Sequence, residues 1–131
     1  MTNTFEDAVC NVYFRGSSHT GGQLYVALYT AAPGEASAGT EVAGGWYARQ
    51  TTGATPSTAW TDPASTGITA NATQLTWSAV TGSSVTVVAV SIMSASSGGT
   101  MWMYKVLGAS VTYNVGDIPI ILANGLQVQF Q

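Results

Sequence analysis

The spacing of hydrophobic and polar residues predicts one short helix followed by an all-β body. Over residues 4–15, apolar side chains recur at the spacing of one helical face, Thr4 is placed to cap the start, and Gly16 is placed to end it. After the polar connector that follows, short runs rich in β-branched and aromatic residues alternate with Gly, Ser, Asn and Pro. This alternation is typical of short strands joined by tight turns.

The first half of the body is predicted to hold a central strand flanked by loops. Residues 23–30 place apolar side chains on both faces of a strand, which is typical of a strand covered by two layers. Residues 31–45 are predicted to form a long, turn-rich contact loop, and 46–52 resume extended structure. The Pro-, Ser- and Thr-rich stretch 53–72 favours loops and short edge strands.

The second half is predicted to contain the core of the sheet. Residues 73–80 and 85–95 form two strands, and the second of these runs is nearly continuously apolar. A glycine-rich turn at 97–99 leads into 101–107, so 85–107 is the clearest hairpin in the sequence. Further strands separated by tight turns follow at 111–115, 118–123 and 126–130.

These elements predict a single all-β domain spanning residues 1–131. About eight or nine short strands with antiparallel connections and one N-terminal helix favour a β-sandwich, with the helix against one sheet or an edge. A small barrel is the competing arrangement. No period of 20 to 50 residues repeats, so solenoids and propellers are not supported.

The composition changes this picture from a lone domain to a subunit. Only 7% of the residues are charged and 46% are hydrophobic, whereas roughly a quarter of an average soluble domain is charged. A soluble monomer normally covers its surface with charged side chains. We therefore expect neighbouring chains to cover part of this surface.

Charge and hydropathy also exclude several partners. The net charge is −3 and the only cations are Arg15, Arg49 and Lys105, which argues against binding to nucleic acid. No apolar run approaches the roughly 18 to 20 residues of a membrane span. Glu6 and Asp7 lie where a secretory signal would need basic and apolar residues, so we expect the chain to be made in a cytoplasm.

The supply of reactive side chains is too thin for an obvious active site. His19 lies in a polar connector and is expected to be a solvated loop residue. Cys10 has no basic neighbour one turn away and is expected to be a small buried residue. Glu35, Glu41 and Asp62 lack the spacing of a calcium loop. We expect no catalytic residue, metal ion or cofactor.

The remaining candidates are residues that could contact a partner. The aromatic side chains offer either a carbohydrate platform or packing in the core and at subunit interfaces, and we favour packing. Arg49, in a chain nearly without cations, is expected to form a structural ion pair with Glu41 across the base of the 31–45 loop. The candidate interface residues are Pro33, Glu35, Glu41, Trp46, Tyr47, Arg49, Trp60 and Asp62.

A series of short motifs runs through most of the chain. In order, they are the short helix, Phe14-Arg15-Gly16, Leu24-Tyr25-Val26-Ala27-Leu28-Tyr29-Thr30, Ala32-Pro33, Gly39-Thr40-Glu41-Val42, Gly44-Gly45, Tyr47-Ala48-Arg49-Gln50, Gly98-Gly99 and Val115-Gly116-Asp117. In this order the motifs resemble a family of small virion proteins of tailed bacteriophages, and residues 53–72 match least.

The resemblance implies a non-enzymatic virion protein made in the bacterial host. The leading hypothesis is a capsid decoration, or cement, protein: a homotrimer that binds the outer head shell and stabilises it by bridging major capsid protein subunits. Its contacts would come from the 31–45 loop, the 53–66 loop and the N-terminal segment. The alternative is a tail-fibre or baseplate module whose Trp and Tyr side chains face a host glycan.

Overall fold

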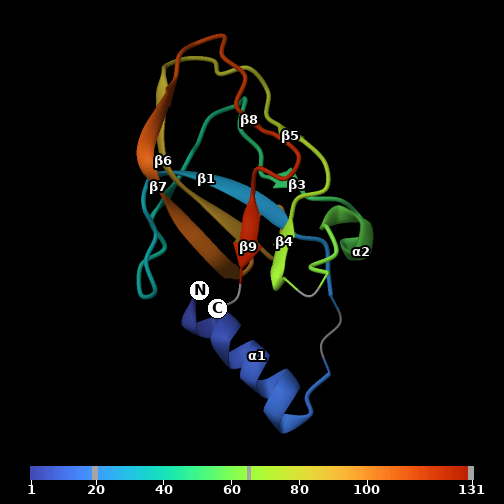
Figure 1. Cartoon of the computed structure of the whole chain (residues 1–131). Coiled ribbons are helices and arrows are strands. Elements are labelled where there is room, and N and C mark those ends of the chain that lie inside the picture. The colour runs from blue at the N-terminus through green and yellow to red at the C-terminus, as the bar shows by residue number, and fades with distance from the viewer. Residues whose placement is uncertain (19–20, 65, 130–131) are drawn as a thin grey trace.

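The computed structural model describes residues 1–18, 21–64 and 66–129, and these are mostly β (Figure 1). The fold class predicted from the sequence is confirmed: nine antiparallel strands and a short N-terminal helix are present in these residues, without a closed barrel. The elements are α1 (Asn3–Arg15), β1 (Tyr25–Ala31), β2 (Thr40–Glu41), β3 (Gln50–Thr51), α2 (Pro56–Ala59), β4 (Ile68–Ala70), β5 (Leu75–Thr76), β6 (Val85–Met93), β7 (Met101–Tyr113), β8 (Ile120–Ile121) and β9 (Gln127–Gln129).

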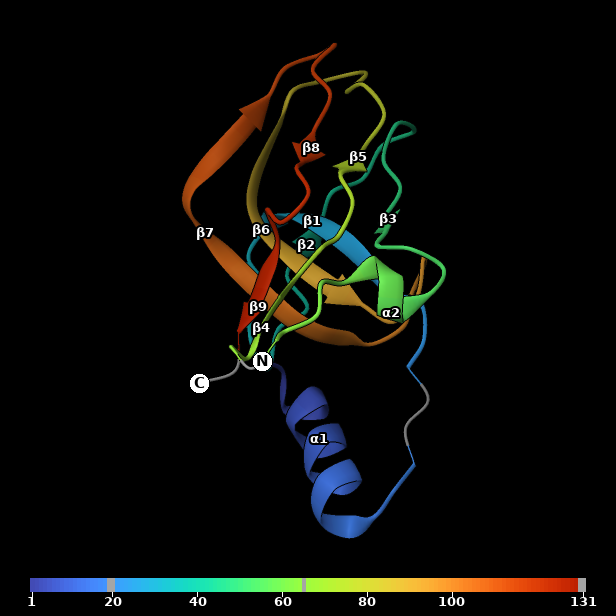
Figure 2. The same ribbon diagram turned by 45° about the vertical axis from the view of Figure 1, so that its right-hand side comes forward.

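The strands form one large sheet and two small ones. The large sheet has the order β2-β1-β6-β7, and β3 pairs with β1 beside β2. The small sheets are β4-β9 and β5-β8, and they lie over one face of the large sheet (Figures 1 and 2). The result is a two-layer sandwich whose second layer is built from short pieces.

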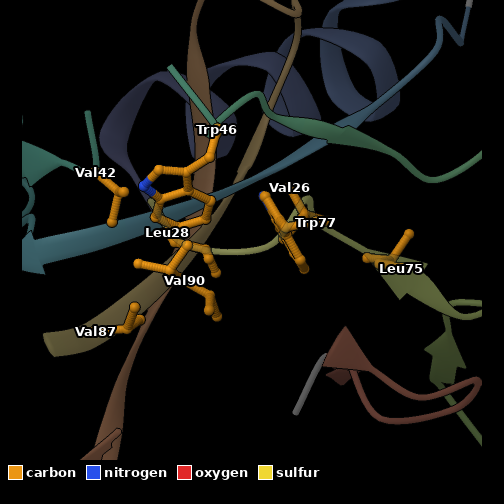
Figure 3. Packing of buried hydrophobic residues seen from close by; sticks show 9 residues of the cluster. Val26, Leu28, Val42, Trp46, Leu75, Trp77, Val87 and Val90 are labelled. Carbon is orange, nitrogen blue, oxygen red and sulfur yellow. The ribbon is translucent and has the colours of Figure 1, made fainter. Parts of the chain in front are cut away.

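The main core fills the space between these layers (Figure 3). In β1, Val26 and Leu28 point into it while Ala27 and Tyr29 are buried on the opposite face, so the predicted central strand is confirmed. The second layer contributes apolar side chains from β5 and the segment after it. The buried members of the main core are Val26, Leu28, Val42, Trp46, Leu75, Trp77, Val80, Val87 and Val90.

The predicted hairpin between β6 and β7 is confirmed, but β7 is longer than the sequence suggests. Residues 111–113 continue β7, so the prediction of a separate strand at 111–115 is wrong. Val87 pairs with Val111 and Ala89 pairs with Val106, so β7 carries three extra residues at this point. Such a bulge bends a strand without ending it, whereas the Gly-Ala-Ser sequence that fills it has the composition of a turn.

The N-terminal helix is capped by Thr2 and not by the expected Thr4. The Thr2 hydroxyl accepts a hydrogen bond from the Phe5 amide, and the Thr2 amide donates to the carbonyl of Trp102 in β7. This second bond fixes the start of α1 to the sheet, while the rest of the helix projects away from it (Figure 2). Gly16, with φ of 70°, ends the helix as predicted.

No side chain of α1 is fully buried. Cys10 is exposed, so its predicted burial is wrong, because only the first turn of the helix packs on the sheet. The prediction for His19 and the last residue of the predicted 126–130 strand fall outside the described residues. Among the described helices, none has the length and apolar character needed to cross a membrane.

Five short elements differ from the sequence prediction, and two of them, β3 and β8, are only shorter than the strands predicted at 46–52 and 118–123. The 31–45 loop contains β2, because Gly39 (φ of 67°) turns the chain back onto β1, where a Cβ would lie 2.6 Å from the Ala31 carbonyl oxygen. Pro56 starts α2, whose four residues are too few to show helical periodicity. The predicted strand 73–80 pairs only over β5. After β5, Trp77 and Val80 form isolated backbone hydrogen bonds with residues 116–119.

Candidate functional site

An apolar groove lies where α1, the small β4-β9 sheet and the ends of β6 and β7 meet. Its volume is about 420 Å³, which is within the roughly 300–1,000 Å³ of small-molecule sites. Segments from across the whole sequence form its walls. The lining residues are Phe5, Gly21, Gly22, Gln23, Leu24, Pro56, Trp60, Thr69, Ile92, Ser94, Trp102, Met103 and Val128.

Two tryptophans give the groove its chemical character. The Nε1 atoms of Trp60 and Trp102 are both buried, so the parts of the rings that reach the groove are carbon. Phe5 of α1 packs edge-on against Trp102 with ring centroids 5.3 Å apart at 85°. The groove therefore offers aromatic carbon surface, and the first turn of α1 forms one of its sides.

A polar rim accompanies these rings. Gly21 and Gly22 lack side chains and are exposed, so their backbone is accessible. Gln23 reaches across to the Thr51 hydroxyl at 2.7 Å, and its side-chain oxygen accepts from the Tyr25 hydroxyl at 2.8 Å. Backbone amides and a fixed side-chain amide beside an aromatic surface are suited to a ligand that has both apolar faces and hydroxyl groups.

Asn71 is a buried residue that holds the second layer beside the groove. Its side chain donates to the carbonyls of Thr73 and Leu122 and accepts from the Leu126 amide. Its backbone forms a bridge with Trp60. Asn71 is fully buried, and it thereby ties the tryptophan wall to the end of the chain. Sequence analysis did not single it out, because an Asn among Ala and Thr residues is typical of a loop.

An ion pair holds together β2, the segment before β3 and the turn between β6 and β7. Nε and Nη2 of Arg49 donate to the two carboxylate oxygens of Glu41 at 2.8 and 2.7 Å, as the sequence predicted. Nη1 of Arg49 also donates to the carbonyls of Ala95 and Gly98. The Tyr47 hydroxyl donates to Glu41 at 2.8 Å and accepts from a β1 amide. We call Glu41, Tyr47 and Arg49 the loop anchor.

Electrostatics favour the charged form of this pair. Burial alone would raise the pKa of Glu41, but hydrogen bonds from Arg49 and Tyr47 together with the Arg49 charge hold that pKa below its ordinary value. Burial raises the pKa of the Tyr47 hydroxyl, which therefore keeps its proton and donates. The groups of the loop anchor are thus fixed in the protonation states that their hydrogen bonds require.

The structure places the predicted contact residues in four settings, and their role toward a partner stays a prediction. Three form the loop anchor, Pro33 and Trp46 are buried, and Trp60 lines the groove. Glu35 and Asp62 are exposed. The structure does not bring the eight together into one surface. The groove itself was missed at the sequence level because its walls come from segments that only the fold brings together.

No reactive cluster accompanies the groove or the loop anchor. Within residues 1–18, 21–64 and 66–129, no three His, Cys, Asp or Glu side chains lie close enough together to hold a metal ion. The titratable groups of the loop anchor bind one another. The described residues thus form a small, charge-poor β domain with an apolar groove and a bidentate ion pair.

The family match identifies the kind of protein to which this chain belongs. Residues 1–129 match the family described as Podophage GP4 fiber I protein gp80, and the chain belongs to this family. It is therefore a structural protein of a phage fibre and a component of the virion, which confirms the resemblance drawn from the motifs. No curated protein matches the chain. The family supports the fibre alternative better than the capsid decoration role expected first.

Proposed function

We propose that this chain is a fibre module that attaches the virion to its host, and that the groove between Trp60 and Trp102 binds a sugar unit of a host-surface glycan. The observation that carries this proposal is the pair of tryptophans in an apolar groove on a chain of a phage fibre family. Binding requires no catalysis, in keeping with a structural family and with the sparse titratable groups.

The groove suits a carbohydrate more than a charged ligand. Sugar rings carry C–H faces that stack on aromatic carbon and hydroxyl groups that bind backbone and amide groups. The groove supplies both, from its tryptophans and from Gly21 to Gln23. None of the described lining residues is charged, so a phosphate or carboxylate would find no counter-ion there.

Trp60→Ala is expected to weaken binding to the recognised glycan at least ten-fold, because one stacking wall is lost. The measurement is a glycan array with the full chain, followed by titration of the best hit. Tyr13→Ala is the matched control, since Tyr13 is an exposed aromatic residue on α1 outside the groove lining. The control is expected to bind as the unchanged chain does.

A second variant guards against loss of binding through misfolding. Gly22→Leu adds a side chain at the rim where space is available, and it leaves the tryptophans in place. It is expected to reduce glycan binding while the thermal unfolding temperature stays within a few degrees. Glycan binding that survives both Trp60→Ala and Gly22→Leu contradicts the groove as the binding site.

The copy number of this chain in purified particles tests the fibre role independently of any glycan. A fibre protein is present at a few per cent of the major capsid protein, whereas a cement protein approaches one copy per capsid subunit. We expect the lower value. Mass spectrometry with labelled reference peptides measures the ratio. A ratio near one would contradict the fibre role and support a cement protein of the head shell.

A further inference from the structure

Aliphatic side chains from both layers of the sandwich line the groove together with its tryptophans. Ile92 pairs with Met103 across β6 and β7, so their side chains lie on the same face of the large sheet. Val128 pairs with Thr69 across β4 and β9 in the same way. All four residues line the groove. Each layer therefore contributes a directly paired couple of residues to its walls.

A second bulge in β7 explains how Trp102 and Met103, which are neighbours in the sequence, line the same groove. Ile92 pairs with Met103, but the next residue of β6 pairs with Met101, so Trp102 is an extra residue in β7. Neighbouring side chains of a regular strand point to opposite faces, whereas a bulge re-aims a side chain. The bulge thus brings aromatic and aliphatic surface to one groove.

The polar side chains of the described lining are already bonded within the chain. Besides Gln23 at the rim, the Thr69 hydroxyl donates to the carbonyl of Thr61 at 2.7 Å. The Ser94 hydroxyl accepts from the Thr100 amide at 2.8 Å. The indole nitrogens of both tryptophans are buried. Groups that can bind the hydroxyls of a ligand are therefore concentrated at the rim, where the backbone of the glycine pair is exposed.

We propose that the sugar unit bound in the groove is a 6-deoxyhexose, whose methyl group packs against Ile92, Met103 and Val128 while its ring hydroxyls bind at the rim. This inference rests on the proposed glycan-binding role of the groove. A methyl group needs no hydrogen-bond partner. The CH2OH group of the parent hexose would instead bring a hydroxyl to aliphatic side chains that cannot replace its bonds to water.

An N-acetylated sugar fits this lining less well, although it also carries a methyl group. Its acetamide places an N–H and a carbonyl next to that methyl, and both lose their bonds to water when they are buried against aliphatic side chains. A 6-deoxyhexose adds apolar surface without a further polar group. The groove is therefore expected to prefer 6-deoxyhexoses to parent hexoses and to N-acetylhexosamines alike.

The test is binding of the full chain to sugar conjugates that differ by one oxygen atom. L-Fucose is compared with L-galactose and L-rhamnose with L-mannose on the same carrier, and N-acetylglucosamine is the acetamido probe. In at least one pair, the 6-deoxy sugar is expected to bind at least about ten-fold more tightly, because an apolar pocket rejects an added hydroxyl by up to roughly 100-fold. Trp60→Ala is expected to weaken this binding.

Val128→Thr tests the methyl contact directly. It replaces one methyl group on β9 with a hydroxyl and keeps a β-branched residue, which suits a strand. The preference for the 6-deoxy sugar is expected to fall by about five-fold, since the hydroxyl of the parent hexose gains a partner. Met103→Gln makes a similar change in the large sheet. Val106→Thr is the matched control, because Val106 is exposed on β7 outside the lining.

The outcomes separate this inference from the glycan-binding role itself. Binding that depends on Trp60, but in which the parent hexoses or N-acetylglucosamine bind as tightly as the 6-deoxy sugars, overturns the inference alone. So does a preference that survives both Val128→Thr and Met103→Gln, provided that each variant unfolds within a few degrees of the unchanged chain. Failure of every conjugate to bind overturns both proposals.

Discussion

Arg49→Ala is expected to lower the free energy of unfolding by about 3 kcal/mol, because it removes one partner of a largely buried ion pair. The Arg49 side chain is only 9% exposed and its guanidinium binds both oxygens of Glu41. The substitution leaves that carboxylate and the carbonyls of Ala95 and Gly98 without their donor. Chemical denaturation at neutral pH measures the loss.

The control for this prediction is Arg15→Ala. Arg15 is exposed in the last turn of α1, and its removal is expected to change the unfolding free energy by less than about 0.5 kcal/mol. Equal effects of the two substitutions would mean that the loop anchor contributes nothing beyond a surface charge. The loss of unfolding free energy in Arg49→Lys is expected to lie between the losses in Arg49→Ala and Arg15→Ala, since a lysine cannot bind both carboxylate oxygens in the same geometry.

The contribution of the loop anchor also depends on pH. The pKa of Glu41 lies below its ordinary value of 4.5 in the folded chain, so at acid pH the unfolded chain binds the proton first. The ion pair therefore stabilises the fold above pH 4.5, and its contribution is lost as the pH falls through the lower, folded pKa. The difference in stability between the unchanged chain and Arg49→Ala is expected to shrink over that range.

Asn71→Ala is expected to destabilise the fold by a similar amount, about 3 kcal/mol, because it leaves three backbone groups without their hydrogen-bond partner. Those groups are the carbonyls of Thr73 and Leu122 and the Leu126 amide. The bonds to Leu122 and Leu126 tie the residue after β4 to the segment before β9. Because Trp60 forms a backbone bridge with Asn71, the substitution is also expected to loosen the tryptophan wall.

Thermal unfolding and near-ultraviolet circular dichroism follow these two effects separately. Asn114→Ala is the control, because Asn114 is exposed in a turn where the structure gives hydrogen bonds only to its backbone. It is expected to alter stability by less than about 0.5 kcal/mol. An Asn71→Ala variant as stable as this control would show that water satisfies the groups that the amide now holds.

The elements that could be predicted from sequence are those with local signals. β1 could be predicted as a central strand because its residues are apolar on both faces, and both faces are buried. The ion pair was predictable because Arg49 is one of only three cations in the chain. The family motifs indicated a virion protein, which the family match confirms.

The features that could not be predicted depend on contacts between distant segments. Cys10 lies on a helix whose packing ends after one turn, and no local pattern reveals where a helix leaves its sheet. The bulge in β7 has the composition of a turn and is kept extended by pairing with β6. The groove is lined by residues from α1, α2, β4, β6, β7 and β9, and its two tryptophans are far apart in the sequence. No local pattern therefore indicates it.

The scarcity of charge beyond residue 62 bears on how this chain responds to its medium. From there to the end of the sequence only Lys105 and Asp117 are charged. Dissolved ions weaken contacts by screening charges over about 10 Å at 0.1 M ionic strength, and here there is almost nothing to screen. Contacts through the groove should therefore keep their strength in dilute and in saline water alike, while salts excluded from protein surfaces strengthen them.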